Sequence, residues 1–99
     1  MPAYWIARSH VNNAEAYARY AQRVPDILAR FGGEILARGG KFKVLEGTDQ
    51  FERFVVVQFP SLEQAAACHA SAEYQAAAQY RSGGVGLVDL IIVEGLETT

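Results

Sequence analysis

The chain is poor in cysteine and histidine, with one cysteine and two histidines among 99 residues. A single cysteine excludes an intramolecular disulfide, and no Cys/His cluster has the spacing of a zinc site. We interpret Cys68 as a small apolar residue on a helix, because nothing near it in sequence indicates thiolate activation. The sequence therefore predicts no metal site and no cofactor.

Strong charge and long apolar runs are absent as well. The formal net charge is -2, and charged residues make up 20% of the chain, which argues against a broad phosphate-binding surface and against a nucleic-acid partner. No apolar run approaches the ~20 residues that span a bilayer. The first residues lead straight into a strand, without a basic segment and an apolar signal core. We expect a cytoplasmic protein with no membrane partner.

Several motifs of known enzyme classes are also missing. We find no phosphate-binding glycine loop, no serine elbow and no paired metal carboxylates. Residues 83–86 read Gly-Gly-Val-Gly, but this stretch follows a predicted helix and precedes a predicted strand. That order is the reverse of a dinucleotide-binding loop.

What the chain does contain is one pattern written twice: a strand, a helix and a return strand. The predicted strands are residues 4–11, 34–38, 54–59 and 87–93. Two β-α-β units in one chain predict a ferredoxin-like α+β fold, with an antiparallel sheet and helices on one of its faces. We assign residues 1–99 to a single domain of this kind.

Local signals mark the ends of the helices. Asn12 with Glu15 predicts a capping box for the first helix, and Ser61 with Gln64 predicts one for the second. Pro25 predicts a kink or a break in the first helix, because proline removes one helical hydrogen bond. We also expect a break near Ser71, and a short strand at residues 43–46 between two turn signals.

Alternation along the strands divides their residues between the two sheet faces. One set is almost wholly apolar and is assigned to the face under the helices: Trp5, Ala7, Ser9, Val11, Ile35, Ala37, Val55, Val57, Phe59, Val88, Leu90 and Ile92. The other set is both apolar and charged: Tyr4, Ile6, Arg8, His10, Leu36, Arg38, Phe54, Val56, Gln58, Leu87, Asp89, Ile91 and Val93. A face bathed in water would be mostly polar. We therefore expect a homodimer in which two such faces pair, sheet against sheet, as a dimeric α+β barrel.

Longer motifs along the whole chain resemble a known family. They are Tyr4-Trp5-Ile6-Ala7-Arg8, Glu15-Ala16-Tyr17, Arg38-Gly39-Gly40, Val44-Leu45-Glu46-Gly47, Phe59-Pro60-Ser61-Leu62-Glu63, Ser71-Ala72-Glu73-Tyr74-Gln75 and Val93-Glu94-Gly95. In this order they resemble the domain-of-unknown-function family 1330 of the dimeric α+β barrel superfamily. The resemblance implies the fold and dimerisation. Superfamily relatives include cofactor-free monooxygenases, isomerases, haem enzymes and ligand-sensing domains, so it implies no particular reaction.

The main candidate for ligand binding is Arg38, which precedes Gly39 and Gly40 at the end of a strand. The glycines would let a ligand approach the backbone, and the guanidinium would hold a carboxylate or enolate through two hydrogen bonds. The alternative is an ion pair with Asp89 or with an acidic residue across the dimer, the two glycines merely making a turn. Arg8 lies on the same predicted face and has the same two interpretations.

His10 and Asp89 are the candidates for proton transfer. Histidine titrates near neutral pH and suits a general base, but His10 lies at a strand end, where an exposed histidine is common. Asp89 is surrounded by apolar residues in its strand, so it is either a base or a structural counter-ion. Three hypotheses follow: a cofactor-independent enzyme or binding protein acting on a small acidic or aromatic compound in a dimer cavity, a ligand-sensing module without chemistry, and a purely structural dimer.

Overall fold

A computed structural model describes residues 1–96 of the chain. The elements follow the order β1 (Ala3–Val11), α1 (Ala14–Arg30), β2 (Glu34–Arg38), β3 (Arg53–Phe59), α2 (Leu62–Ala70), α3 (Ala72–Ala78), a 3₁₀ turn (Gln79–Arg81) and β4 (Gly86–Glu94). The strands form one antiparallel sheet in the order β2-β3-β1-β4. The predicted ferredoxin-like fold is confirmed, and each predicted strand of the two β-α-β units is present.

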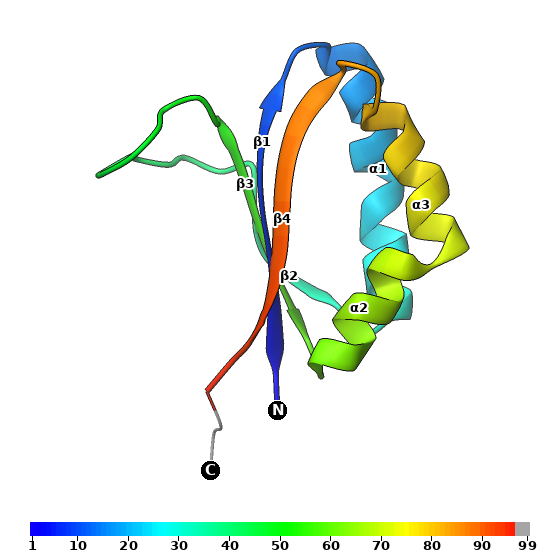
Figure 1. Cartoon of the computed structure of the whole chain (residues 1–99). Coiled ribbons are helices and arrows are strands. Elements are labelled where there is room, and N and C mark those ends of the chain that lie inside the picture. Colours follow the sequence, from blue (N-terminus) through cyan, green and yellow to red (C-terminus); the bar gives the residue numbers. More distant parts are fainter. Residues whose placement is uncertain (97–99) are drawn as a thin grey trace.

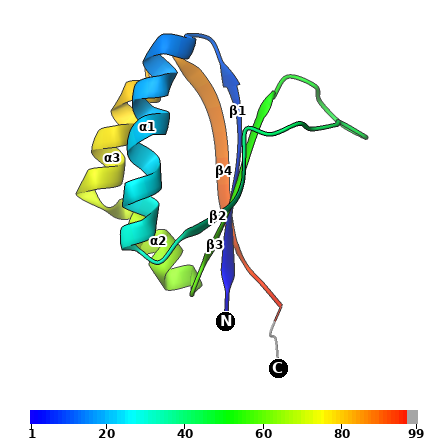
Figure 2. The ribbon, with the colours of Figure 1, turned by 180° about the vertical axis from the view of Figure 1, so that it is seen from behind.

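The helices cover one face of the sheet and leave the other open (Figure 1). Seen from behind, the same two layers appear with α1 nearest to the viewer (Figure 2). The core lies between the layers and contains Trp5, Val57 and Phe59 from the sheet with Leu28 and Tyr74 from the helices. Among the described residues, no helix is long and apolar enough to cross a membrane.

Helix α1 differs from its prediction at two points. Its N-cap is Asn13, whose side chain accepts a hydrogen bond from the Ala16 amide at 3.0 Å, whereas the side chain of Asn12 donates to the Gly84 carbonyl at 3.1 Å. The predicted capping residue was therefore off by one position. Pro25 lies inside one continuous helix, so a break at Pro25 was wrong. Pro25 deprives only the carbonyl of Ala21 of its helical hydrogen bond. The helix continues because α1 packs on the core both before and after the proline, through Tyr17, Tyr20, Ile27 and Leu28.

The second helical region follows its prediction closely. Ser61 caps α2, accepting from the Gln64 amide at 3.1 Å. Ser71 ends α2 and begins α3, with an extended backbone at φ -64° and ψ 148°. Its hydroxyl donates to the Cys68 carbonyl and accepts from the Tyr74 amide. The predicted break near Ser71 is confirmed.

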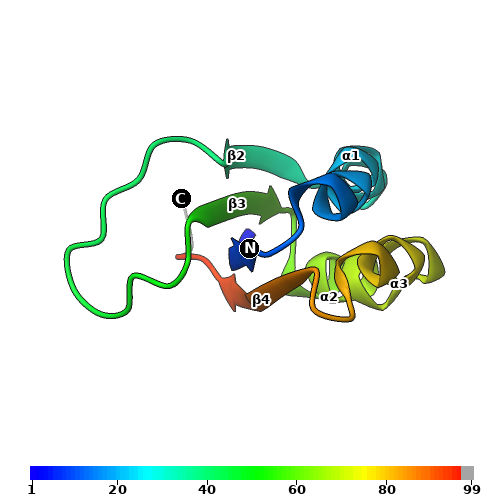
Figure 3. The same ribbon diagram turned by 90° about the horizontal axis from the view of Figure 1, so that it is seen from above.

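The segment between β2 and β3 forms no strand. Residues 43–46, predicted as a short strand, belong to a loop that projects from the sheet on the side opposite the helices (Figure 3). A strand needs a hydrogen-bonded neighbour, and β2 already ends at Arg38, so no neighbour is available. That prediction was wrong.

Candidate functional site

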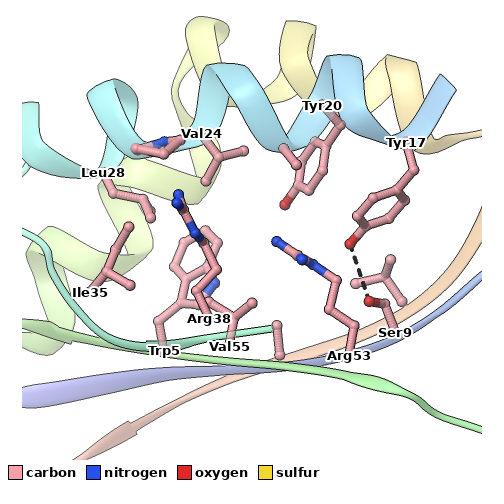
Figure 4. A pocket seen from close by; sticks show the side chains of 14 residues that line it. Trp5, Ser9, Tyr17, Tyr20, Val24, Leu28, Ile35, Arg38, Arg53 and Val55 are labelled. Carbon is pink, nitrogen blue, oxygen red and sulfur yellow. Dashed lines mark hydrogen bonds between the residues drawn. The ribbon is translucent and has the colours of Figure 1, made fainter. Parts of the chain in front are cut away.

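A cavity lies between α1 and the sheet, and two arginines extend into it (Figure 4). Its volume is about 30 Å³, which is room for about two water molecules at roughly 15 Å³ each. Most of the lining is apolar, from Trp5, Ala7, Ala21, Val24, Pro25, Leu28, Ile35, Val55 and Val88. The polar lining consists of Ser9, Tyr17, Tyr20, Arg38 and Arg53. A few polar groups converging in an apolar cavity are typical of a small-molecule site.

Arg38 reaches this cavity because of a β-bulge in β2. Ile35 pairs with Val57, but Ala37 pairs with Val56 and Arg38 with Val55, so Leu36 is an extra residue in the ladder. One extra residue reverses the alternation that follows it. The assignment of Arg38 to the open face, and of Ala37 to the helix face, was therefore wrong. Arg38 is exposed and also lines the cavity, so the cavity reaches the surface at the edge of β2.

Arg53 comes from the neighbouring strand, β3, and was missed by the sequence analysis. It pairs with Ser9 and shares the helix face with Val55 and Val57. Its Nε is buried and has no hydrogen-bond partner among residues 1–96, and its guanidinium lies 5.7 Å from the ring centre of Tyr17. The signal was present, because extending the alternation of β3 back by one residue places Arg53 on the apolar face.

The glycines after Arg38 shape the approach of Arg53. Gly39 has a left-handed φ of +66°, and a Cβ there would lie 2.9 Å from Arg53 Nη1. Gly40 has open space around it. Gly39 is thus needed for the turn and for the guanidinium beside it, while nothing in the structure requires a glycine at position 40.

The tyrosines at the cavity are connected by hydrogen bonds. The hydroxyl of Tyr17 donates to Ser9 Oγ at 3.2 Å. The hydroxyls of Tyr20 and Tyr74 are 2.7 Å apart, and Arg81 Nη2 donates to the Tyr74 oxygen at 3.3 Å. Burial is the main cause that raises the pKa of Tyr20. Tyr20 is therefore a neutral phenol at physiological pH.

The other predicted site residues lie on the opposite face of the sheet. Arg8 is paired with Asp89 across β1 and β4, with its Nη2 at 3.0 Å and its Nε at 3.1 Å from Oδ2. The Arg8 guanidinium also lies 4.2 Å from the ring centre of Phe51. Both members of the ion pair are about half exposed. Such pairs contribute about 0–1 kcal/mol to stability, and Asp89 pairs with Arg8 rather than with Arg38.

His10 also has an acidic partner. Its Nδ1 lies 2.9 Å from Glu52 Oε2, and the other carboxylate oxygen accepts from the Val11 amide at 2.7 Å. The hydrogen bond with Glu52 raises the pKa of His10. The Val11 amide is the main cause that lowers the pKa of Glu52, followed by His10. The structure therefore does not bring His10 or Asp89 together with Arg38.

Metal and thiol chemistry find little support in the described part of the chain. No group of three His, Cys, Asp or Glu side chains within residues 1–96 is placed to hold a metal ion. Cys68 is buried, and burial raises the pKa of its thiol to about 11. The thiol is thus protonated at neutral pH, in agreement with its interpretation as a small apolar residue.

Solved structures with the same fold come from several bacteria. A protein of unknown function from Rhodopseudomonas palustris is 20% identical, with a TM-score of 0.78 over 98% of this chain and 84% of the other. A dimeric ferredoxin-like protein of unknown function from Jannaschia is 14% identical, with a TM-score of 0.67 over 96% of this chain and all of the other. SnoaB, a cofactor-independent oxygenase from Streptomyces nogalater, is 13% identical, with a TM-score of 0.65 over 98% and 95%. At these identities the likeness shows the fold.

Comparison with curated proteins finds no significant match. The sequence pattern of one family, by contrast, extends over nearly the whole chain, from residue 2 to residue 96. This agrees with the resemblance seen in the sequence motifs. The chain belongs to that family, described as Domain of unknown function (DUF1330).

Proposed function

We propose that the protein binds a small organic anion, through a carboxylate or an enolate oxygen, in the cavity between α1 and the sheet. The observation that carries this proposal is the presence of two guanidinium groups in one small apolar cavity. Arg38 and Arg53 have no carboxylate within 4.0 Å among the described residues, whereas Arg8 and Arg30 do. Arg53 is partly buried, and its buried Nε has no partner among residues 1–96. Buried polar groups are normally hydrogen-bonded, and an anionic ligand would supply the missing partner.

The cavity has room for the head group of such a ligand, but not for a whole organic anion. Room for about two water molecules matches the two oxygens of a carboxylate. The rest of the ligand would extend past Arg38 to the edge of β2, where the cavity meets solvent. An arginine on each side allows the bidentate hydrogen bonds that favour carboxylates over neutral groups.

A second candidate function is an enzyme that stabilises an enolate in the same cavity. The similarity to SnoaB, a cofactor-independent oxygenase, favours it, because fixed cationic groups lower the energy of a developing oxyanion. The described lining contains no Asp, Glu, His or Lys, so the cavity offers charge stabilisation rather than a general base. Oxygen uptake with a polyhydroxylated aromatic compound, which reacts as its enolate-like phenolate, would favour this candidate over binding alone if it is present in the wild type and lost in Arg53→Gln.

We further propose that two copies pair through their open sheet faces. Five large apolar side chains on that face are between 40% and 57% exposed: Ile6, Leu36, Leu87, Ile91 and Val93. Monomers rarely leave a continuous apolar patch of this kind uncovered. The similarity to a dimeric ferredoxin-like protein supports a second copy as the covering partner. In such a dimer the Arg8–Asp89 pairs would lie at or near the contact.

The anion proposal is tested by titrating benzoate, and benzamide as its neutral counterpart, into ¹⁵N-labelled protein followed by NMR. We expect benzoate to shift amide signals of Tyr20, Arg38 and Val55, and benzamide to shift them only at much higher concentration. Arg53→Gln and Arg38→Gln should each weaken benzoate binding by about tenfold or more, since hydrogen bonds to charged groups contribute about 1.5–3 kcal/mol.

The matched control is Arg23→Gln, because the guanidinium of Arg23 stacks on Tyr80, away from the cavity. A wild-type protein in which benzoate shifts no signal of the cavity would refute the proposal.

A further inference from the structure

We infer that the hydroxyl of Tyr20 donates a hydrogen bond to the bound anion, and that Arg81 and Tyr74 orient it for this purpose. The inference rests on the proposed anion site and adds to it a third donor, one that selects for ligands whose oxygens only accept. The two protons of the Tyr20–Tyr74 pair have few acceptors within reach.

Arg81 can only donate hydrogen bonds, because its side chain is a guanidinium. Its Nη2 donates to the Tyr74 oxygen at 3.3 Å, which occupies one acceptor position of that oxygen. The side chain also lies over the ring of Tyr20, with 5.0 Å from the guanidinium carbon to the ring centre. Arg81 is thereby anchored against both tyrosines and is only partly buried.

The Tyr74 hydroxyl has one proton, and that proton needs an acceptor. Tyr74 is fully buried, and within residues 1–96 its oxygen has two hydrogen-bond partners, Arg81 Nη2 and the Tyr20 oxygen at 2.7 Å. If Tyr20 donated to Tyr74, the Tyr74 proton would be left in the core without an acceptor, whereas a proton left over on Tyr20 faces the cavity, where water or a ligand can accept it. The favourable arrangement has Tyr74 donating to Tyr20.

The proton of Tyr20 therefore points away from Tyr74 and toward the cavity. Tyr20 lines the cavity, while Tyr74 and Arg81 do not, and its hydroxyl points toward the space between the sheet and α1 (Figure 4). The neighbouring polar groups in that space are the guanidiniums of Arg38 and Arg53, which cannot accept. The Tyr17 hydroxyl donates its own proton to Ser9, so that proton is not available to a ligand. The charged groups of the cavity are thus donors only, and its side-chain acceptors are the hydroxyl oxygens of Ser9 and the tyrosines.

A cavity whose charged groups only donate is complementary to an ion that has only acceptors. A carboxylate or an enolate meets this requirement, whereas an amide or a carboxylic acid brings no negative charge to offset the two guanidiniums. Tyr20 is well suited to this role because its raised pKa keeps the phenol protonated when the anion arrives. The ligand class is therefore a deprotonated oxyacid or enolate, and its neutral form should be rejected.

The test measures the affinities of benzoate and benzamide by the same NMR titration in four variants. Tyr20→Phe should weaken benzoate by about tenfold and reduce the preference for benzoate over benzamide by a similar factor. Tyr74→Phe should have a smaller effect on benzoate, because the Tyr20 hydroxyl remains but is no longer oriented. Tyr80→Phe, which alters an exposed residue of the 3₁₀ turn after α3, should match the wild type.

The double variant Tyr20→Phe with Tyr74→Phe guards against a folding defect. Removing both hydroxyls leaves no buried proton unpaired between them, so the fold should be retained, and benzoate should be weakened about as much as by Tyr20→Phe. If all the tyrosine variants keep the wild-type preference for benzoate while Arg53→Gln loses binding, the anion site stands and the role of Tyr20 is refuted. If benzoate fails to bind the wild type, both the anion site and the role of Tyr20 are refuted.

Discussion

Gly39 and Gly40 are neighbours in the chain with different requirements. Gly39 has a φ of +66° and would bring a Cβ to 2.9 Å from Arg53 Nη1, while Gly40 has neither constraint. We expect Gly39→Ala to lower the free energy of unfolding by about 1–2 kcal/mol through the left-handed backbone. It should also weaken benzoate by moving the guanidinium. Gly40→Ala should stay within about 0.5 kcal/mol of the wild type, and urea denaturation of both variants measures the difference.

His10 and Glu52 form a pair whose contribution depends on pH. The pKa of His10 is raised from its ordinary 6.5, so its contribution to stability is fully present below pH 6.5 and is lost as the pH rises through the folded pKa. The pKa of Glu52 is lowered from 4.5, so its contribution is present above pH 4.5 and is lost as the pH falls through its folded value. The pair therefore contributes most between these limits.

The corresponding prediction concerns the titration of the His10 ring, followed by NMR. The wild type should titrate above 6.5, and Glu52→Gln should bring the midpoint back toward 6.5, because the hydrogen bond to a carboxylate is its main cause. The melting temperature of the wild type should fall relative to His10→Gln as the pH rises through the His10 midpoint. Equal His10 midpoints in the wild type and Glu52→Gln would show that the pair does not form in solution.

At the scale of elements, Ser71 serves two helices at once. Its hydroxyl donates to the Cys68 carbonyl at the end of α2 and accepts from the Tyr74 amide at the start of α3, at 2.7 and 3.1 Å. Ser61 caps only α2. Loss of an N-cap side chain costs about 0.5–2 kcal/mol, so Ser71→Ala should destabilise the fold more than Ser61→Ala does. Urea denaturation compares the two, and equal losses would mean that the second role of Ser71 has little weight.

The strands were predictable from sequence because each has a regular two-residue alternation, but the β-bulge in β2 was not. Leu36 has the side chain of an ordinary strand residue, and only pairing with β3 makes it an extra one. Its presence moved Arg38 to the other face, where it joins Arg53. Tyr17 and Tyr20 are buried residues of α1. That their hydroxyls reach a cavity depends on how α1 packs on the sheet, which periodicity does not show.

At the scale of the whole molecule, the site residues that were all predicted on the open face lie on both faces of the sheet. The helix face contains the proposed anion cavity, while Arg8, His10 and Asp89 lie on the open face and pair with neighbours. The proposed dimer therefore covers a face that does not contain the cavity. It follows that loss of the dimer and loss of anion binding should be separable by mutation.

That separation gives the last prediction. Ile91 is 57% exposed in the middle of the open face, and a charge there would be buried without a partner in a sheet-to-sheet dimer, which costs several kcal/mol. Ile91→Lys should give a monomer by native mass spectrometry at a protein concentration where the wild type is a dimer. It should still bind benzoate, because the cavity is formed within one chain. Ala67→Lys on the exposed side of α2 is the control and should remain dimeric. A monomeric wild type, or an Ile91→Lys variant that stays dimeric, would show that the open face is not where two copies meet.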